Sequence, residues 1–196
     1  MSHLRFLAIS GSLRRSSHNT GLLHALRAQA PSDVTIDVHP DLGALPYFDQ
    51  DLEANPPAPV VELRERVREA DGLIIATPEY NSAIPGVLMN ALDWLSRPSS
   101  GSGDSSLRGK PTAILGASPS QFGTARGQLV LRQILHRVQV PVVAHPEVTV
   151  FRSHQRFDAD GVFIGDEFTE SLLRDFLGEL VRLTQRTRAH AGRVPA

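Results

Sequence analysis

The sequence contains no cysteine, and this absence excludes several kinds of chemistry at once. Without a thiol the chain cannot build a disulfide framework, a thiolate zinc site or an iron–sulfur cluster, and it has no thiol nucleophile. An α/β domain of 196 residues buries roughly 70% of the surface that its unfolded chain exposes, so its core needs no disulfide or metal. We therefore expect one domain that spans residues 1–196.

An excess of charge of one sign is also missing. Lys and Arg number 20 against 21 Asp and Glu, which gives a formal net charge of −1. Such a chain has no overall electrostatic attraction for nucleic acid or for an anionic membrane. No run of about 18 apolar residues is present, and the first strand-like run begins at Leu4 without a basic and apolar leader before it. We expect a cytoplasmic protein that has neither nucleic acid nor a membrane as its partner.

Signatures of metal, hydrolase and nucleoside triphosphate chemistry are absent as well. The eight histidines form no HExxH motif and no pair at helix-face spacing, so we predict no metal site. No GxSxG sequence is present, which argues against a serine hydrolase. The loop after the first apolar run carries neither GxxxxGK nor GxGxxG, because Leu13 and Ser16 stand where these motifs need other residues.

What the sequence does contain is an alternation of apolar runs and amphipathic segments. This alternation is typical of a parallel sheet with helices on both faces. The apolar runs predict strands over residues 4–10, 34–38, 72–77, 112–115 and 142–150. Helical spacing of apolar residues predicts helices around residues 22–26, 60–67, 86–95 and 129–138, and a final helix that Thr169 caps and that runs through residue 181.

Two further segments lead to specific expectations. Residues 86–95 are apolar almost all round the helix, so one face can pack on the sheet while the other needs a second partner, for which a neighbouring subunit is a candidate. Residues 97–109 are rich in serine and glycine, which indicates an exposed and mobile loop.

The loop after the first strand, GSLRRSSHNT over residues 11–20, has the features of a phosphate site. A strand, a polar loop and then a helix expose backbone N–H groups and the positive end of the helix dipole to a ligand. The ordinary alternative is a polar turn before an N-capped helix. One terminal phosphate, as in FMN, suits this loop better than a triphosphate, and the side chains that we expect to contribute are Ser12, Arg14, Ser17, Asn19 and Thr20.

A second candidate segment is TPEYN, which follows the apolar run 72–77. Ligands of open α/β sheets bind at the carboxyl ends of strands, beside the switch in strand order. The ring of Tyr80 suits contact with a planar ligand, and the backbone of residues 78–81 suits the polar edge of such a ring. The alternatives are that Glu79 is a solvated or helix-capping carboxylate and that Tyr80 is a core side chain with a wet hydroxyl.

Three motifs together carry a family resemblance. GSLRRSSHN, then PEYN with IPGVLMNALDWLSRP, then GKP with GASPSQFGTAR over residues 109–126 occur in this order at predicted strand ends. From about Phe6 to Glu147 the chain resembles the NADPH-dependent FMN reductase family, particularly its bacterial quinone and chromate reductase members.

The resemblance implies a flavodoxin-like fold, a three-layer α/β sandwich with a five-stranded parallel sheet in the order 2-1-3-4-5. It also implies noncovalent FMN at the strand carboxyl ends. The residues that match the family's phosphate loop are Ser12, Arg14, Ser17, Asn19 and Thr20. Those that match its ring and ribityl contacts are Pro78, Glu79, Tyr80, Asn81 and Ser118. The chain departs from the family's small-residue and glycine pattern at Ser118, Pro119 and Ser120, and Pro119 lacks a backbone N–H.

The implied activity is hydride transfer from NADPH or NADH through FMN to a small-molecule acceptor such as a quinone, free flavin, azo compound or chromate. We name no catalytic residue, because positioning and dehydration of the flavin suffice. The resemblance also implies a homodimer or homotetramer. Arg126 and Glu147 match positions of subunit contacts, although an ordinary surface ion pair explains them equally well. The alternative functions are a flavodoxin-type electron carrier and a phosphate- or flavin-binding protein without catalysis.

Overall fold

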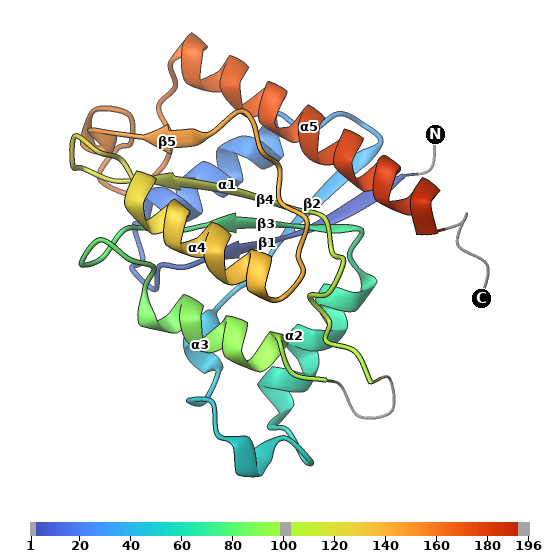
Figure 1. The fold of residues 1–196 in the computed structure, drawn as a ribbon. Helices are drawn as coiled ribbons and strands as arrows, with labels where there is room; N and C mark the ends of the chain where they lie inside the picture. The colour runs from blue at the N-terminus through green and yellow to red at the C-terminus, as the bar shows by residue number, and fades with distance from the viewer. Residues whose placement is uncertain (1–2, 99–102, 192–196) are drawn as a thin grey trace.

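The computed structural model describes residues 3–98 and 103–191, and its centre is a parallel sheet (Figure 1). The five strands lie in the order β2-β1-β3-β4-β5, and each pairs with its neighbours in parallel. This is the predicted flavodoxin-like order. The strand bounds are Leu4–Ser10 for β1, Val34–Val38 for β2, Gly72–Ala76 for β3, Thr112–Ala117 for β4 and Val148–Val150 for β5.

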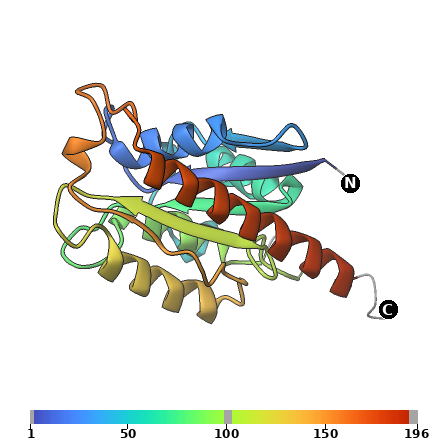
Figure 2. The same cartoon turned by 90° about the horizontal axis from the view of Figure 1, so that it is seen from above.

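Five α-helices cover the two faces of the sheet. They are α1 (His18–Ala28), α2 (Ala58–Glu69), α3 (Gly86–Leu95), α4 (Ala125–Arg137) and α5 (Glu167–Ala191). The helices α1 and α5 pack on one face, and α2, α3 and α4 pack on the other. Figure 2, seen from the side of α1 and α5, shows α5 crossing over the strands. The sheet is therefore the middle of three layers, as predicted.

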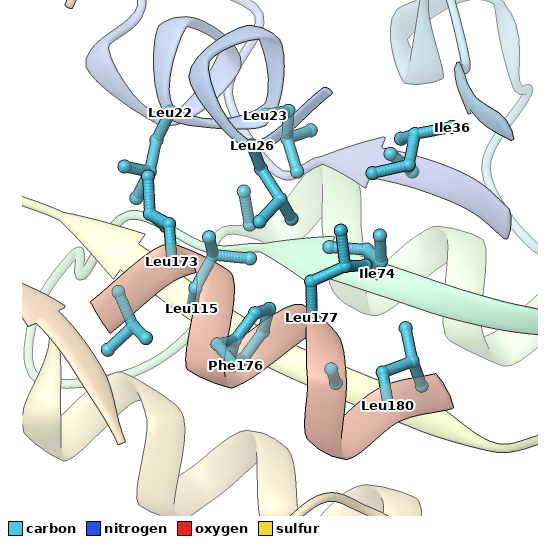
Figure 3. Close-up of a cluster of buried hydrophobic side chains, with 14 of the residues drawn as sticks. Leu22, Leu23, Leu26, Ile36, Ile74, Leu115, Leu173, Phe176, Leu177 and Leu180 are labelled. Carbon is cyan, nitrogen blue, oxygen red and sulfur yellow. The ribbon is translucent and has the colours of Figure 1, made fainter. Parts of the chain in front are cut away.

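Successive strand residues feed two separate cores. In β1, Phe6 and Ala8 point to the core under α1 and α5, while Leu7 and Ile9 point to the core under the other three helices. A strand that is covered on both faces must be apolar at consecutive positions, which explains the unbroken apolar runs in the sequence. Figure 3 shows the first core, which contains leucines of α1 together with Leu173, Phe176, Leu177 and Leu180 of α5.

Several element boundaries differ from the prediction, and the starts of β5 and α4 show why. Strand β5 begins at Val148 rather than at residue 142, and Val142 makes only an isolated bridge to Thr112. Pro146 interrupts the run between them because it has no N–H for a ladder. Helix α4 begins at Ala125, four residues before the predicted start, and its early residues Gly127 and Gln128 are buried by tertiary contacts.

The apolar surface of α3 is mostly covered by its own chain, so it does not require a neighbouring subunit. The ring of Trp94 meets the ring of Phe48 edge-on at 5.0 Å between centroids, and its indole N–H donates to the carbonyl oxygen of Pro46 at 2.8 Å. The side chain of Asn90 accepts from the N–H of Phe48 and donates to the same Pro46 oxygen. Met89 is the exposed large apolar residue of this helix.

The loop expected over residues 97–109 is only partly exposed. Residues 99–102 lie outside the described residues. In the described part, Pro98 and Ser105 form an isolated bridge, and Ser106 and Leu107 are buried. Leu107 joins the core under α2, α3 and α4. The serine-rich composition concealed this anchor, because a single apolar residue in a polar segment gives no periodic signal.

The N-cap of α5 is Asp166, not Thr169 as predicted. The carboxylate of Asp166 accepts from the backbone N–H of Thr169 at 2.8 Å and from its hydroxyl at 2.6 Å. It also pairs with Arg156, whose Nε lies 3.0 Å away. Desolvation acts to raise the pKa of this carboxyl, but the hydrogen bonds from Thr169 and the Arg156 contact outweigh it and hold the pKa of Asp166 below its usual range.

We expect Asp166→Ala to lower the free energy of unfolding by about 1–2 kcal/mol at pH 7, because an N-terminal turn loses its cap. A carboxyl whose pKa is depressed by folding stabilises above its unfolded pKa of about 3.9 and stops doing so as the pH falls through its folded pKa. The difference between wild type and variant in urea unfolding should therefore narrow below about pH 4. Thr169→Ser, which keeps the hydroxyl, is the control, and a difference that does not depend on pH would contradict the ionised cap.

Candidate functional site

Three loops meet at the carboxyl ends of β1, β3 and β4. They enclose an open cavity of about 260 Å³. Eight of the ten predicted site residues line this cavity, and Thr20 and Asn81 do not. The full lining consists of Ser12, Arg14, Ser17, His18, Asn19, Pro78, Glu79, Tyr80, Ala117, Ser118 and Pro119.

The start of α1 presents unused backbone donors to the cavity. The hydroxyl of Ser17 caps the helix by accepting from the N–H of Thr20 at 3.3 Å. Within the described part of the chain, no hydrogen bond uses the N–H of Ser17, His18 or Asn19. Three adjacent N–H groups at the positive end of a helix suit a phosphate dianion.

Arg14 adds a cation at the rim of the same cavity. Its side chain is exposed, and its Nε and Nη2 donate to the hydroxyl of Ser16 at 3.3 and 3.2 Å. The hydroxyl oxygen of Ser12 accepts a hydrogen bond from the backbone N–H of Arg14 at 3.4 Å. The guanidinium is thereby held near the loop and keeps further N–H groups for an anion.

Asn19 has a different task from the one predicted for its side chain. Its amide Nδ2 donates to the carbonyl oxygen of Ala117 at 3.0 Å, and its Oδ1 accepts from the N–H of Ala117 at 2.9 Å. Asn19 is buried, and these two bonds tie the first turn of α1 to the last residue of β4. Its side chain therefore joins two loops, while its backbone N–H is left for the anion. The hydroxyl of Thr20 likewise turns inward and donates to Ser10 Oγ at 2.8 Å.

His18 is a cavity residue that the sequence analysis missed. Its ring stacks on Phe157 with 4.7 Å between centroids, and its Nδ1 lies 2.8 Å from the hydroxyl of Ser153. Burial lowers the pKa of His18, and the positive charges of Arg14 and His154 lower it further. Both effects favour the neutral form of the ring. The signal for His18 in the sequence was its position between Ser17 and Asn19, which were both predicted to contact the phosphate.

The loop after β3 forms a tight turn beside the cavity. Tyr80 and Ala83 exchange two backbone hydrogen bonds of 3.0 Å, and the residues between them, Asn81 and Ser82, have φ angles of 53° and 62°. This turn places Asn81 away from the cavity. The Tyr80 side chain is 52% exposed, so it is not a core residue and stays available to a ligand.

The carboxylate of Glu79 caps α4, which is one of the alternatives that the sequence left open. Its Oε1 accepts from Arg126 Nε at 2.7 Å, and its Oε2 accepts from the backbone N–H of Gly127 at 3.0 Å. The side chain is only 5% exposed. The backbone of Glu79 remains at the cavity while the charged end is engaged by the helix.

The loop after β4 approaches the loop after β3 closely because residue 116 is glycine. A Cβ at Gly116 would collide with the hydroxyl of Thr124 and with the backbone oxygen of Thr77. Beyond it, the N–H of Ser118 donates to the carbonyl oxygen of Val150 at 2.9 Å. Pro119 follows and offers no donor, so the hydroxyl of Ser118 is the polar side-chain group that this loop adds to the cavity wall.

Both residues that match subunit-contact positions have partners within the chain. Arg126 pairs with Glu79, as described, and Glu147 lies 3.8 Å from Arg132 of α4. These pairs fit the ordinary ion-pair explanation, and a role between subunits stays a prediction.

Among residues 3–98 and 103–191 there is no group of three or more His, Asp or Glu side chains that could hold a metal ion. The helices in the same ranges include none that is long and apolar enough to cross a bilayer.

A doubly wound parallel sheet in the order 2-1-3-4-5, with a cavity at the carboxyl ends of β1, β3 and β4, defines a flavodoxin-like protein. The family model for NADPH-dependent FMN reductases matches residues 4–155. The chain belongs to this family of FMN-dependent oxidoreductases.

Several relatives are similar over most of their length. The chain is 40% identical over 174 residues to 2-hydroxy-1,4-benzoquinone reductase of Burkholderia sp., covering 89% of this chain and 92% of the relative. It is 42% identical over 168 residues to an NAD(P)H-dependent FMN reductase of Pseudomonas aeruginosa, covering 85% and 88%. Among solved structures, the flavoenzyme FerB, an NAD(P)H:(acceptor) oxidoreductase from Paracoccus denitrificans, matches with a TM-score of 0.83 at 32% identity, covering 94% and 98%.

Arg14→Ala should weaken the binding of FMN by about 1.5–3 kcal/mol, the usual worth of hydrogen bonds to a charged group, because we expect Arg14 to contact the phosphate. Titration of the apoprotein with FMN, followed by quenching of flavin fluorescence, measures this loss. Arg15→Ala removes the same charge from the next position and is the matched control. Equal affinities of the Arg14 and Arg15 variants would remove Arg14 from the phosphate site.

Proposed function

We propose that the chain holds FMN noncovalently in this cavity and passes a hydride from NADPH or NADH to small acceptors, above all quinones. The observation that carries the proposal is the set of unused N–H groups of Ser17, His18 and Asn19, aligned at the start of α1 beside Arg14. This donor set fits one phosphate dianion. The family membership supports FMN as the phosphate's source.

The rest of the cavity suits the flavin ring. Residues 78–80 directly follow β3, which lies where the order of the strands reverses direction. Their backbone can contact the polar edge of a planar ring. Tyr80 adds an exposed aromatic surface at the rim. The cavity volume of about 260 Å³ is smaller than the roughly 300–1,000 Å³ of most ligand pockets. Because so small a cavity does not surround a flavin, we expect one face of the ring to stay open.

FMN, when bound, supplies the capacity to take up a hydride at N5 and to give two electrons to an acceptor. The protein's contribution is to bind the phosphate, fix the ring and keep water from its buried face. The ionisable side chains of the lining are Arg14, His18, Glu79 and Tyr80. Glu79 is engaged by α4, and His18 by Ser153 and Phe157, which supports a reaction without a general acid or base.

Quinones are the acceptors that we favour, because relatives from Burkholderia sp. and Escherichia coli are named for quinone reduction. A shared open face also admits free flavins, azo compounds and chromate. We further propose a homodimer or homotetramer in the cytoplasm. Phe122 in the loop after β4 and Leu129 in α4 have exposed side chains, which support association with a second copy of the chain.

The competing function is a flavodoxin-type electron carrier or a flavin-binding protein without catalysis. A carrier exchanges electrons with a protein partner and does not oxidise a nicotinamide by itself. The net charge of −1 lacks the acidic excess that would favour such a partner. The reductase is therefore the better interpretation.

Anaerobic mixing of the FMN-loaded protein with NADPH or NADH should bleach the flavin absorbance, and a benzoquinone should restore it. Because both substrates use the same open face in turn, steady-state rates should give parallel double-reciprocal lines. Apoprotein without FMN is the control for direct transfer. A bound flavin that neither nicotinamide reduces would exclude the reductase and favour the carrier.

A further inference from the structure

The loop after β3 contacts the start of α4. In Figure 1 this green loop lies beside the beginning of the yellow helix. A Cβ at Gly127 would lie 3.2 Å from the backbone oxygen of Ala83, so the helix start abuts the turn. The two elements are joined by Glu79, whose carboxylate reaches Arg126 and the N–H of Gly127.

We propose that Arg126 is a positioning residue for the flavin site, acting through Glu79. This inference rests on the proposed binding of FMN in the cavity. Arg126 holds the loop of residues 78–83, whose first three residues line the cavity, and it balances the charge of a carboxylate that is almost fully removed from water. Arg126 itself is half-exposed and is not part of the cavity lining.

The turn needs such a support because its backbone is strained. Asn81 and Ser82 are consecutive residues with left-handed φ angles, and neither is glycine. Each residue of this kind carries an energetic cost that the surrounding structure must offset. The bonds from Arg126 and Gly127 hold Glu79, immediately before the turn, and leave its backbone and that of Pro78 in place at the cavity.

Arg126 also connects this turn to the loop after β4. Its guanidinium carbon lies 4.9 Å from the ring centroid of Phe122, which precedes α4. The same guanidinium donates from Nη2 to Glu79 Oε1 at 2.6 Å. One side chain therefore contacts both loops, and its loss would release both at once.

The ion pair of Arg126 and Glu79 leads to a prediction that a purely structural role of Arg126 would not give. Reduction adds negative charge to a bound flavin, so a nearby unbalanced carboxylate opposes it and an unbalanced cation favours it. Arg126→Gln leaves the carboxylate of Glu79 without its cation, and we expect the midpoint potential of bound FMN to become more negative. Glu79→Gln leaves Arg126 without its carboxylate and should shift the potential in the positive direction.

The experiment measures the Kd of FMN and the potential of the loaded protein by dithionite titration against redox dyes. Arg126→Gln should raise the Kd about tenfold, as expected for the loss of a hydrogen bond to a charged group. The double variant Glu79→Gln/Arg126→Gln should return the potential toward that of wild type while its Kd stays raised. Arg132→Gln, which removes the Arg of another ion pair on α4, should leave both quantities unchanged.

The proposal is overturned if both single variants shift the potential in the same direction, if neither shifts it, or if Arg126→Gln leaves the Kd within twofold of wild type. Should Arg126→Gln fail to fold by circular dichroism, Arg126→Lys replaces it. The lysine variant keeps the charge, so its flavin potential should match that of wild type while its Kd for FMN rises. A flavin potential more negative than that of wild type in the lysine variant would contradict the proposal. Neither measurement uses a nicotinamide or an acceptor, so a wild type that fails to oxidise NADPH would contradict the proposed activity alone.

Discussion

The side-chain amide of Asn19 holds the start of α1 against the end of β4, and the geometry of the site depends on this link. One amide group both donates to and accepts from the backbone of Ala117. An aspartate cannot donate, and a glutamine is one carbon longer, so asparagine is the side chain that fits this exchange. The link fixes the first turn of α1 relative to the sheet. It thereby determines where the N–H groups of Ser17, His18 and Asn19 point, and these are the groups that an anion would meet.

The other loops are held in the same manner, by polar side chains that bond to backbone. Glu79 reaches the N–H of Gly127, and the hydroxyl of Ser17 reaches the N–H of Thr20. Buried polar groups are costly when they lack partners, but here each one satisfies a backbone group that a loop would otherwise leave open. The apolar cores lie on the two faces of the sheet and fix the layers, whereas these hydrogen bonds at the carboxyl ends of the strands fix the loops.

Most of the architecture could be predicted from the sequence, because strands covered on both faces read as continuous apolar runs. The exception at α4 has a physical cause. Helix α4 begins before its apolar periodicity does, since Gln128 is buried by bonding its side chain to the carbonyl oxygen of Val148 rather than by packing. Such tertiary contacts leave no trace in a local pattern. The same holds for the site: Asn19 and Glu79, which the sequence singled out, line the cavity, but only the structure shows that their side chains bond to neighbouring loops.

This division of labour also bears on the breadth of acceptors. The side chains best able to recognise a specific polar substrate, Asn19 and Glu79, are used within the protein. What remains at the cavity includes a set of backbone N–H groups, the cation of Arg14, the hydroxyl of Ser118 and the exposed ring of Tyr80. Backbone donors and one cation select a phosphate, and an aromatic ring tolerates any planar surface. Under the proposed function, a site assembled in this way would select its cofactor strictly and its second substrate only by shape, which suits a flavin with one open face.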